Sequence, residues 1–375
     1  MSTALPSAGD ATNAGSPPGH APTPLDPAVP AASPAAPRGG DGFHDPAVRH
    51  LPELQASDLG QQPKSRLDHQ VGDPPTGQLP PQRNLLLPAI LFVATCVSTF
   101  WVGCTHWEPL QPEYFGTWEL VGRTMRDNWQ TGLKYMAAVV AILLTHEMGH
   151  FLQTVRYGIP ASYPLCIPVP FNAIGTMGAV IGMDAARANR RQIFDVGIAG
   201  PLAGLVVAFP VLWIGIKQLN LSGGSHTGEI QFYLPLVGQW MLRWAHPDET
   251  WAGARWVAMS QLNPYFMAGW VGMLITGLNM LPVSQLDGGH TIYALFLDGA
   301  HFLARLFISF AILYVVINLD HAVLWTPMLL LIIFLGIHHP ATVDDKVPLG
   351  PVRWAIGLAS LAIPVLCFPL LGVRP

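Results

Sequence analysis

The chain has 375 residues, of which 50% are hydrophobic and only 11% are charged, and its formal net charge is −4. A soluble domain carries about a quarter charged residues, so this composition favours a membrane protein. The small negative charge argues against nucleic acid as a partner. The four cysteines form no CxxC pair, which argues against a cysteine-based zinc site or a disulfide framework and leaves only a Cys96–Cys104 pair open.

Residues 1–84 have the composition of a disordered tail. They hold 16 of the 36 prolines and a single aromatic residue, Phe43, so they cannot bury enough apolar surface to offset the entropy lost on ordering. The first residues lack the basic and apolar regions of a cleavable signal peptide, so we expect an internal helix to direct membrane insertion. We predict a solvated tether, with a docking site for a regulator as the alternative.

Residues 85–375 are predicted to form one membrane-embedded domain. About 20 apolar residues cross the hydrocarbon core of a bilayer, and candidate stretches follow one another from Leu85 onward. The predicted fold is therefore an all-α, polytopic membrane protein with about seven transmembrane helices. The expected spans are residues 85–103, 133–156, 193–217, 263–283, 302–318, 322–338 and 353–372.

Basic residues set the expected orientation. The segment between the second and third spans carries Arg156, Arg187, Arg190 and Arg191, and loops rich in arginine and lysine stay in the cytoplasm. The amino terminus then also lies in the cytoplasm, and the loops 104–132 and 218–262 lie outside. We expect a multi-pass protein of the bacterial cytoplasmic membrane.

The second span contains the pattern HEMGH, formed around His146, Glu147 and His150. Residues four apart lie on one face of a helix, where two imidazoles can hold one zinc ion and the intervening glutamate can activate a water. A pair of hydrogen-bonded histidines at a helix contact is the alternative. Such polar residues are costly in a run of Ala, Val, Ile and Leu, which favours a metal that offsets that cost.

The predicted site needs a third protein ligand, because a catalytic zinc usually has three and keeps one position open for water. The fourth span ends in GLNMLPVSQLDGGH, which places Asn279 and Asp287 near a membrane boundary, and two glycines after Asp287 allow a sharp turn. By the orientation above, HEMGH and LDGG both lie toward cytoplasmic span ends. Asp287 is therefore the predicted ligand, with a cap or loop role as the alternative. Asp184 and Asp195 are expected to pair with the arginine cluster, and Asp298 lies further along the chain.

Together these segments resemble a known family. HEMGH in a membrane span, GIAGPLAG opening the next span and NMLPVSQLDGGH in a later one are similar to the site-2 protease family of intramembrane zinc metalloproteases, peptidase family M50. PLCIPVPFNAIGTMGAVI and HHPATVDDKVPLG resemble segments of the branch that includes the plant chloroplast enzymes and their bacterial relatives. The resemblance covers roughly residues 85–350.

The resemblance implies a role for each site residue. His146, His150 and Asp287 would be the ligands of one Zn2+ per chain. Glu147 would be the catalytic base, and Asn279 would help to bind the oxyanion or the substrate backbone. His338 and His339, in the HHPATVDDKVPLG segment, are expected in a cytoplasmic turn rather than on a metal.

Small residues and prolines surround the predicted site. Gly200 and Gly204 form a GxxxG step, which lets the third span approach the zinc-bearing span closely, with a kink near Pro201 as the alternative. Prolines and glycines break residues 160–183 too often for a spanning helix. Because non-helical backbone at membrane depth needs protein or water around it, we predict a re-entrant loop beside the site, with a plain cytoplasmic loop as the alternative.

The predicted function is that of an intramembrane zinc metalloprotease, which hydrolyses peptide bonds of membrane-protein substrates within or next to the lipid bilayer. Its substrate would carry a transmembrane helix, and a regulator docking to the tail is a further possible partner. A membrane metal-binding transporter or an inactive protease-like scaffold is the alternative, because intramembrane His, Glu and Asp also mark ion pathways. Glu147 favours the protease, since a transporter needs no base between the two histidines.

Overall fold

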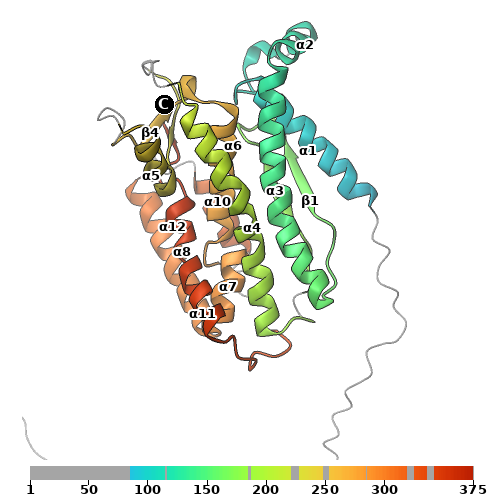
Figure 1. The fold of residues 1–375 in the computed structure, drawn as a ribbon, viewed down its shortest axis with the longest axis vertical. Coiled ribbons are helices and arrows are strands. Elements are labelled where there is room, and N and C mark those ends of the chain that lie inside the picture. The colour runs from blue at the N-terminus through green and yellow to red at the C-terminus, as the bar shows by residue number, and fades with distance from the viewer. Residues whose placement is uncertain are drawn as a thin grey trace, which may run out of the picture. The chain divides into compact units, whose positions relative to one another are not determined.

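A computed structural model describes residues 85–374, apart from residues 115, 185–186, 221–227, 248–252, 284, 319–324 and 336–341. The predicted tail, residues 1–84, lies outside the described residues, as do His338 and His339. The described part of the chain is mostly helical, as predicted (Figure 1). All four cysteines are free thiols, so the Cys96–Cys104 pair does not form.

Four helices in the described ranges are long and apolar enough to cross a membrane. They are α1 (Leu86–Cys104), α3 (Trp129–Tyr157), α4 (Arg190–Lys217) and α8 (Gly299–Ile317). They correspond to the first, second, third and fifth predicted spans. Their length and apolar composition are those of an integral membrane protein.

The other three predicted spans are not single long helices in the described residues. The fourth becomes α6 (Pro264–Asn279), of 16 residues, followed by a turn and then α7 (Asp287–Phe296). The sixth overlaps α10 (Thr326–Leu335), whose flanking residues lie outside the described ranges. The seventh is divided between α11 (Pro351–Ser360) and α12 (Ile363–Cys367). Pro364 lies in the first turn of α12, just after this division, where a missing backbone donor is tolerated.

The helix that faces the HEMGH segment has a well-defined beginning. At the start of α4, the Asn189 side chain accepts a hydrogen bond from the Gln192 backbone, and the Gln192 side chain accepts one from the Asn189 backbone. This reciprocal pair is a capping box, which satisfies two otherwise unpaired amides. Helix α3 ends at Tyr157 and is followed by Gly158, whose φ of 65° is the left-handed conformation that glycine adopts freely.

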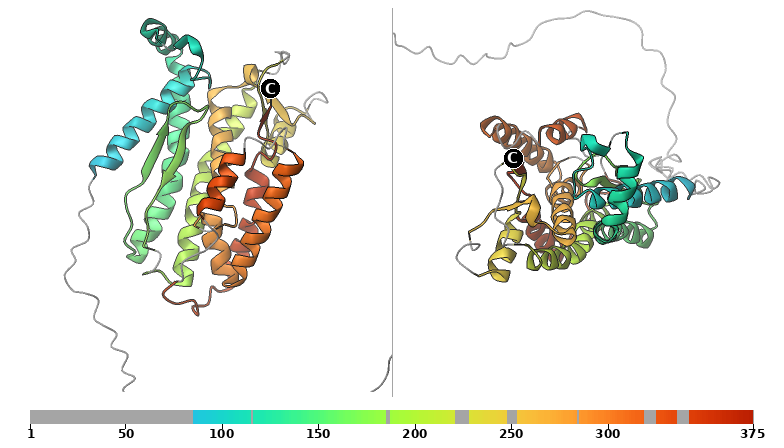
Figure 2. Two further views of the ribbon diagram at one scale, coloured as in Figure 1. Left: turned by 180° about the vertical axis from the view of Figure 1, so that it is seen from behind. Right: turned by 90° about the horizontal axis from the view of Figure 1, so that it is seen from above.

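The core lies where α3, α4 and α6 meet (Figure 1). Ile142 of α3, Leu212 of α4 and Met273 of α6 are buried there in one hydrophobic cluster. The remaining short elements gather near the end of this bundle from which α2 projects (Figure 2). They are η1 (Pro112–Tyr114), α2 (Trp118–Asp127), α5 (Leu236–Ala245), η3 (Met259–Gln261) and an antiparallel sheet of β3 (Gln231–Tyr233), β4 (Trp256–Ala258) and β5 (Val373–Arg374).

The segment 160–183, predicted as a re-entrant loop, contains a β-hairpin. Strand β1 (Leu165–Val169) pairs antiparallel with β2 (Gly175–Val180), and the hairpin extends beside α1 and α3 (Figure 2). Asn172 organises the turn, since its side chain accepts hydrogen bonds from the amides of Ile174 and Gly175. Pairing within the hairpin satisfies backbone groups that an open loop would leave unpaired.

Side chains of two spanning helices hold the hairpin turn. Ser98 of α1 donates a hydrogen bond of 2.6 Å to the Gly175 carbonyl, and Tyr135 of α3 donates one of 2.7 Å to the Ile174 carbonyl. Tyr135 is fully buried. The hairpin is therefore fixed against the same helix that carries HEMGH.

Candidate metal centre

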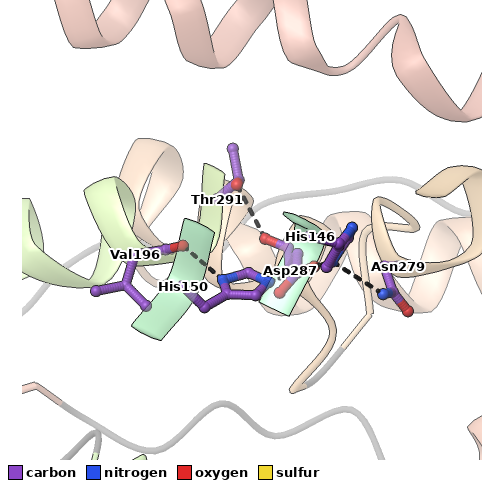
Figure 3. Close-up of polar contacts among 6 residues, drawn as sticks. All are labelled: His146, His150, Val196, Asn279, Asp287 and Thr291. Atoms are coloured by element: carbon purple, nitrogen blue, oxygen red, sulfur yellow. Dashed lines mark hydrogen bonds and ion pairs between the residues drawn. The ribbon is translucent and has the colours of Figure 1, made fainter. Parts of the chain in front are cut away.

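Three predicted ligands from two distant segments converge in the structure (Figure 3). His146 and His150 lie on α3 and are 2% and 8% exposed. The Nε2 atoms of these two imidazoles lie 3.2 Å and 3.3 Å from the Asp287 Oδ2 atom, at the start of α7. One donor atom from each of the three residues lies within 4.8 Å of the other two. Donors at this spacing can share one metal ion.

The turn between α6 and α7 brings Asp287 to the histidines. The backbone of Leu281 donates to the Leu278 carbonyl at 3.1 Å and closes the end of α6. Gly288 then lies against the turn, where a Cβ atom would be only 2.2 Å from the Met280 carbonyl oxygen. The two glycines after Asp287, which could have allowed a sharp turn, instead lie within α7. The role of Gly288 is close packing of α7 against the preceding turn.

A backbone carbonyl orients His150. Its Nδ1 atom lies 2.8 Å from the Val196 carbonyl oxygen of α4. Because a carbonyl only accepts, Nδ1 carries the proton and donates. In the neutral imidazole, Nε2 is then the nitrogen without a proton, and it faces Asp287, where it can bind a metal.

The GxxxG step of α4 lies directly against the two imidazoles. A Cβ atom on Gly200 would stand 2.0 Å from His150 Nε2, and one on Gly204 would stand 3.0 Å from His146 Nδ1. The two glycines are four residues apart on α4, and the two histidines are four residues apart on α3. Because the helices run in opposite directions, Gly200 faces His150 and Gly204 faces His146. The predicted close packing of these two spans is confirmed, and α4 continues through Pro201 to Lys217.

The two other predicted site residues also lie at this centre. The Asn279 Nδ2 atom is 3.3 Å from His146 Nε2. Glu147 is buried, with 4% exposed, and lines a cavity of about 160 Å3 together with His150, Asn279 and Asp287. Residues of β2 form part of the cavity wall.

Sequence reasoning missed three further polar residues of this cavity, Thr154, Gln285 and His290. His290 stands three positions after Asp287 in α7, so the helical period places it near the same face. That spacing is the signal in the sequence that could have identified it. Gln285 belongs to the turn before α7, whose path the sequence does not reveal.

The other carboxylates that were weighed as ligands lie elsewhere. Asp184 pairs with Arg187 at 2.8 Å, as predicted. The prediction that Asp195 pairs with the arginine cluster is wrong, because it binds Arg353 at 2.7 Å. Within that cluster, Arg190 instead donates to the carbonyl oxygens at the end of α7. Asp298 is exposed just before α8.

Fold and site together define a multi-pass membrane protein with a buried two-histidine, one-carboxylate group beside a buried glutamate. Residues 134–317 match the model of peptidase family M50. This part of the chain is therefore a domain of peptidase family M50, the family of the site-2 proteases, and the resemblance inferred from its motifs is confirmed.

Curated plant proteins are similar to this chain. One is the probable zinc metalloprotease EGY1, chloroplastic, of Oryza sativa subsp. japonica, 32% identical over 44% of this chain and 28% of the relative. Two others are probable chloroplastic zinc metalloproteases of Arabidopsis thaliana. EGY1 is 31% identical over 42% of this chain, and EGY2 is 30% identical over 43% of it. In each case the match covers 28% of the relative. The chain thus spans less than a third of the relatives it matches. No solved structure matches it.

Proposed function

We propose that the chain is an intramembrane zinc metalloprotease that hydrolyses peptide bonds of membrane-protein substrates. The observation that carries this proposal is the convergence of His146, His150 and Asp287 beside Glu147. Two imidazoles and one carboxylate form a donor set that suits a catalytic zinc with one open position. The relatives are named as zinc metalloproteases, which supports one Zn2+ per chain.

The chemistry divides between the metal and the chain's own residues. A zinc ion held there supplies Lewis acidity toward a scissile carbonyl and a water molecule. Glu147 accepts the proton of the attacking water and returns it to the leaving amine. The Asn279 amide, beside His146, donates to the carbonyl oxygen as negative charge develops on it. His146, Glu147 and His150 are buried by protein, which keeps these polar groups away from the lipid.

The hairpin supports a way to hold the substrate. A transmembrane helix has its amides internally bonded, so it must unwind locally before hydrolysis. Ala179 and Val180 of β2 line the cavity, and among the described residues β2 pairs with β1 alone, in a two-stranded sheet. We propose that this hairpin is the re-entrant element of the fold, and that an unwound substrate segment adds to the free edge of β2.

The membrane orientation is a further part of the proposal. Arg190 and Arg191, at the start of α4, contact the backbone of residues 294–295 and 348, so basic residues gather at that end of the helices. The bias of basic loops supports a cytoplasmic location for this end. We propose a protein with about seven spans in a bacterial cytoplasmic membrane, with an amino-terminal tail that tethers or docks a regulator.

Metal dependence and cleavage together test the function. The purified full-length chain is mixed in detergent with a protein that carries one transmembrane helix, and the products are mapped by mass spectrometry. We expect cuts within or next to that helix, their loss after treatment with a zinc chelator, and their return with added Zn2+. Cleavage that persists in the metal-free protein would contradict the proposal. Metal uptake without cleavage of any membrane substrate would favour a transporter or scaffold.

A further inference from the structure

One carboxylate near the metal centre has no part in the proposed chemistry. Asp195, in the second turn of α4, precedes Val196, the residue whose carbonyl accepts from His150. The guanidinium of Arg353 binds both carboxylate oxygens of Asp195, with Nε 2.7 Å from Oδ1 and a terminal nitrogen 2.8 Å from Oδ2. The Tyr157 hydroxyl also donates to Oδ2. The carboxylate is largely buried, with 12% of its side chain exposed.

These contacts join three elements that are distant in the sequence. Tyr157 is the last residue of α3, Asp195 lies in α4, and Arg353 belongs to α11. Arg353 is 158 residues away from Asp195 along the chain. A two-pronged contact between a guanidinium and a carboxylate fixes direction as well as distance.

The contact between α3 and α4 needs such fixed points. It is built from small residues: a Cβ on Gly149 would stand 2.5 Å from the Ala199 carbonyl oxygen, and Gly200 and Gly204 lie against the histidines. Small residues allow close approach, and at such short distances the position of α4 along α3 decides whether both imidazoles fit. The Tyr157–Asp195 contact sets that position one residue away from the Val196 carbonyl.

We propose that Asp195 is a positioning residue for His150, an inference that rests on the proposed metal centre. Held by Tyr157 and Arg353, it keeps the Val196 carbonyl 2.8 Å from His150 Nδ1, and so keeps Nε2 directed at the metal position. A small slide of α4 would lengthen this hydrogen bond, whose strength falls steeply with distance and angle. Loss of a group that orients a metal ligand typically lowers metal affinity about 10- to 100-fold.

Cobalt binding separates positioning from simple stability. The full-length chain is purified in detergent, stripped of metal and titrated with Co2+, whose visible absorption bands report the ligand geometry. We expect Asp195→Asn to weaken binding, by less than the roughly 10- to 100-fold typical for loss of a direct partner of a ligand, and to shift the bands. Tyr157→Phe removes one donor to the carboxylate and should change affinity in the same direction by a smaller factor. Asp184→Asn, which breaks the more exposed pair with Arg187, is the matched control and should change neither.

If Asp195 only stabilised the fold, the Co2+ spectra of Asp195→Asn would change in a different way. A smaller folded fraction would reduce all bands in proportion, with their positions unchanged. Wild-type affinity and band positions in folded Asp195→Asn would overturn the inference and leave the metal centre intact. If Asp195→Asn does not fold, the same comparison is decided by Tyr157→Phe. Failure of the wild-type chain to bind Co2+ or Zn2+ would overturn the proposed metal centre, and this inference with it.

Discussion

Asp287 is the donor on which the metal centre depends most, because it alone among the three comes from outside α3. The two histidines share one helix face whatever the rest of the fold does. Asp287 reaches them only through the turn after α6 and the packing of Gly288 against Met280. Substitution of this one residue therefore tests the tertiary arrangement as well as the chemistry.

Asp287→Ala should lower zinc affinity and abolish cleavage, because it leaves two protein ligands where a catalytic zinc wants three. Asp298→Ala is the matched control in the same region, since Asp298 is exposed and should affect neither property. Zinc content by elemental analysis and cleavage of a membrane substrate measure the two effects. An experimental structure with zinc bound by Asp184 or Asp195, and with Asp287 distant, would contradict the assignment.

The residues of the centre were largely predictable, and the groups that orient them were not. The four-residue spacing of His146 and His150 fixes a shared face, and the order of the spans predicts the depth of Asp287. The role of the Val196 carbonyl could not be predicted from the sequence, because every residue has a backbone carbonyl. The Asp195–Arg353 pair joins residues 158 positions apart, and nearer arginines offered an equally plausible partner.

At the scale of elements, the contact between α3 and α4 makes the site possible. The imidazoles of His146 and His150 lie against α4 where glycines leave room for them. At Gly200 and Gly204, the side chains that limit the size of an α4 residue are the imidazoles of His150 and His146. The contact predicts that a single methyl group added to α4 would reach the proposed metal ligands.

Gly200→Ala should destabilise the protein by about 1–3 kcal/mol or more, because it adds an atom to a filled space. The new Cβ atom would stand 2.0 Å from His150 Nε2, so the imidazole must move and zinc affinity should fall. Gly122→Ala is the control: Gly122 lies in α2 with nothing within 4 Å of a Cβ, and alanine there should stabilise by up to about 1 kcal/mol. Thermal unfolding and zinc titration measure both. Wild-type zinc affinity in Gly200→Ala would contradict the packing.

Hydropathy predicted where the spanning helices lie but not where each helix ends. The apolar run 263–283 indicated one span, yet α6 ends at Asn279, and residues 280–283 belong to the turn that delivers Asp287. Apolar residues fill both the helix and the turn, so composition alone does not mark the end. For the hairpin, the sequence predicts an irregular loop because prolines and glycines recur throughout residues 160–183, and one of them, Pro168, lies within strand β1. Its proline and glycine content excluded a helix correctly but did not reveal strand pairing.

At the scale of the whole molecule, the spanning helices place the predicted inner and outer segments at opposite ends. The elements of the loops 104–132 and 218–262 lie near one end of the helices, and the segment after α10 that contacts Arg191 lies near the other (Figure 1). This separation is what a multi-pass protein requires, but it does not say which end faces the cytoplasm. Residues 156–191, from the end of α3 to the start of α4, carry four arginines, whereas the loops 104–132 and 218–262 carry two each, and this moderate bias supports a cytoplasmic location for the end that contains Arg190 and Arg191.

Reporter fusions test this orientation. A reporter fused after Arg190 should read as cytoplasmic, because the basic segment before α4 is retained inside the cell. A reporter fused near Trp244, which is 82% exposed at the far end of the helices, should read as external. The reverse pattern would invert the proposed topology and open the catalytic cavity toward the other side of the membrane.

The paired measurement of zinc content and cleavage in a Glu147→Gln variant tests the central claim most directly. Glutamine is nearly the same size as glutamate and leaves His146, His150 and Asp287 in place, but it cannot accept a proton from water. The account predicts that the purified variant keeps one Zn2+ per chain while cleavage of a membrane substrate falls by at least about 100-fold. Cleavage at the wild-type rate by the zinc-loaded variant would contradict the assignment of Glu147 as the catalytic base.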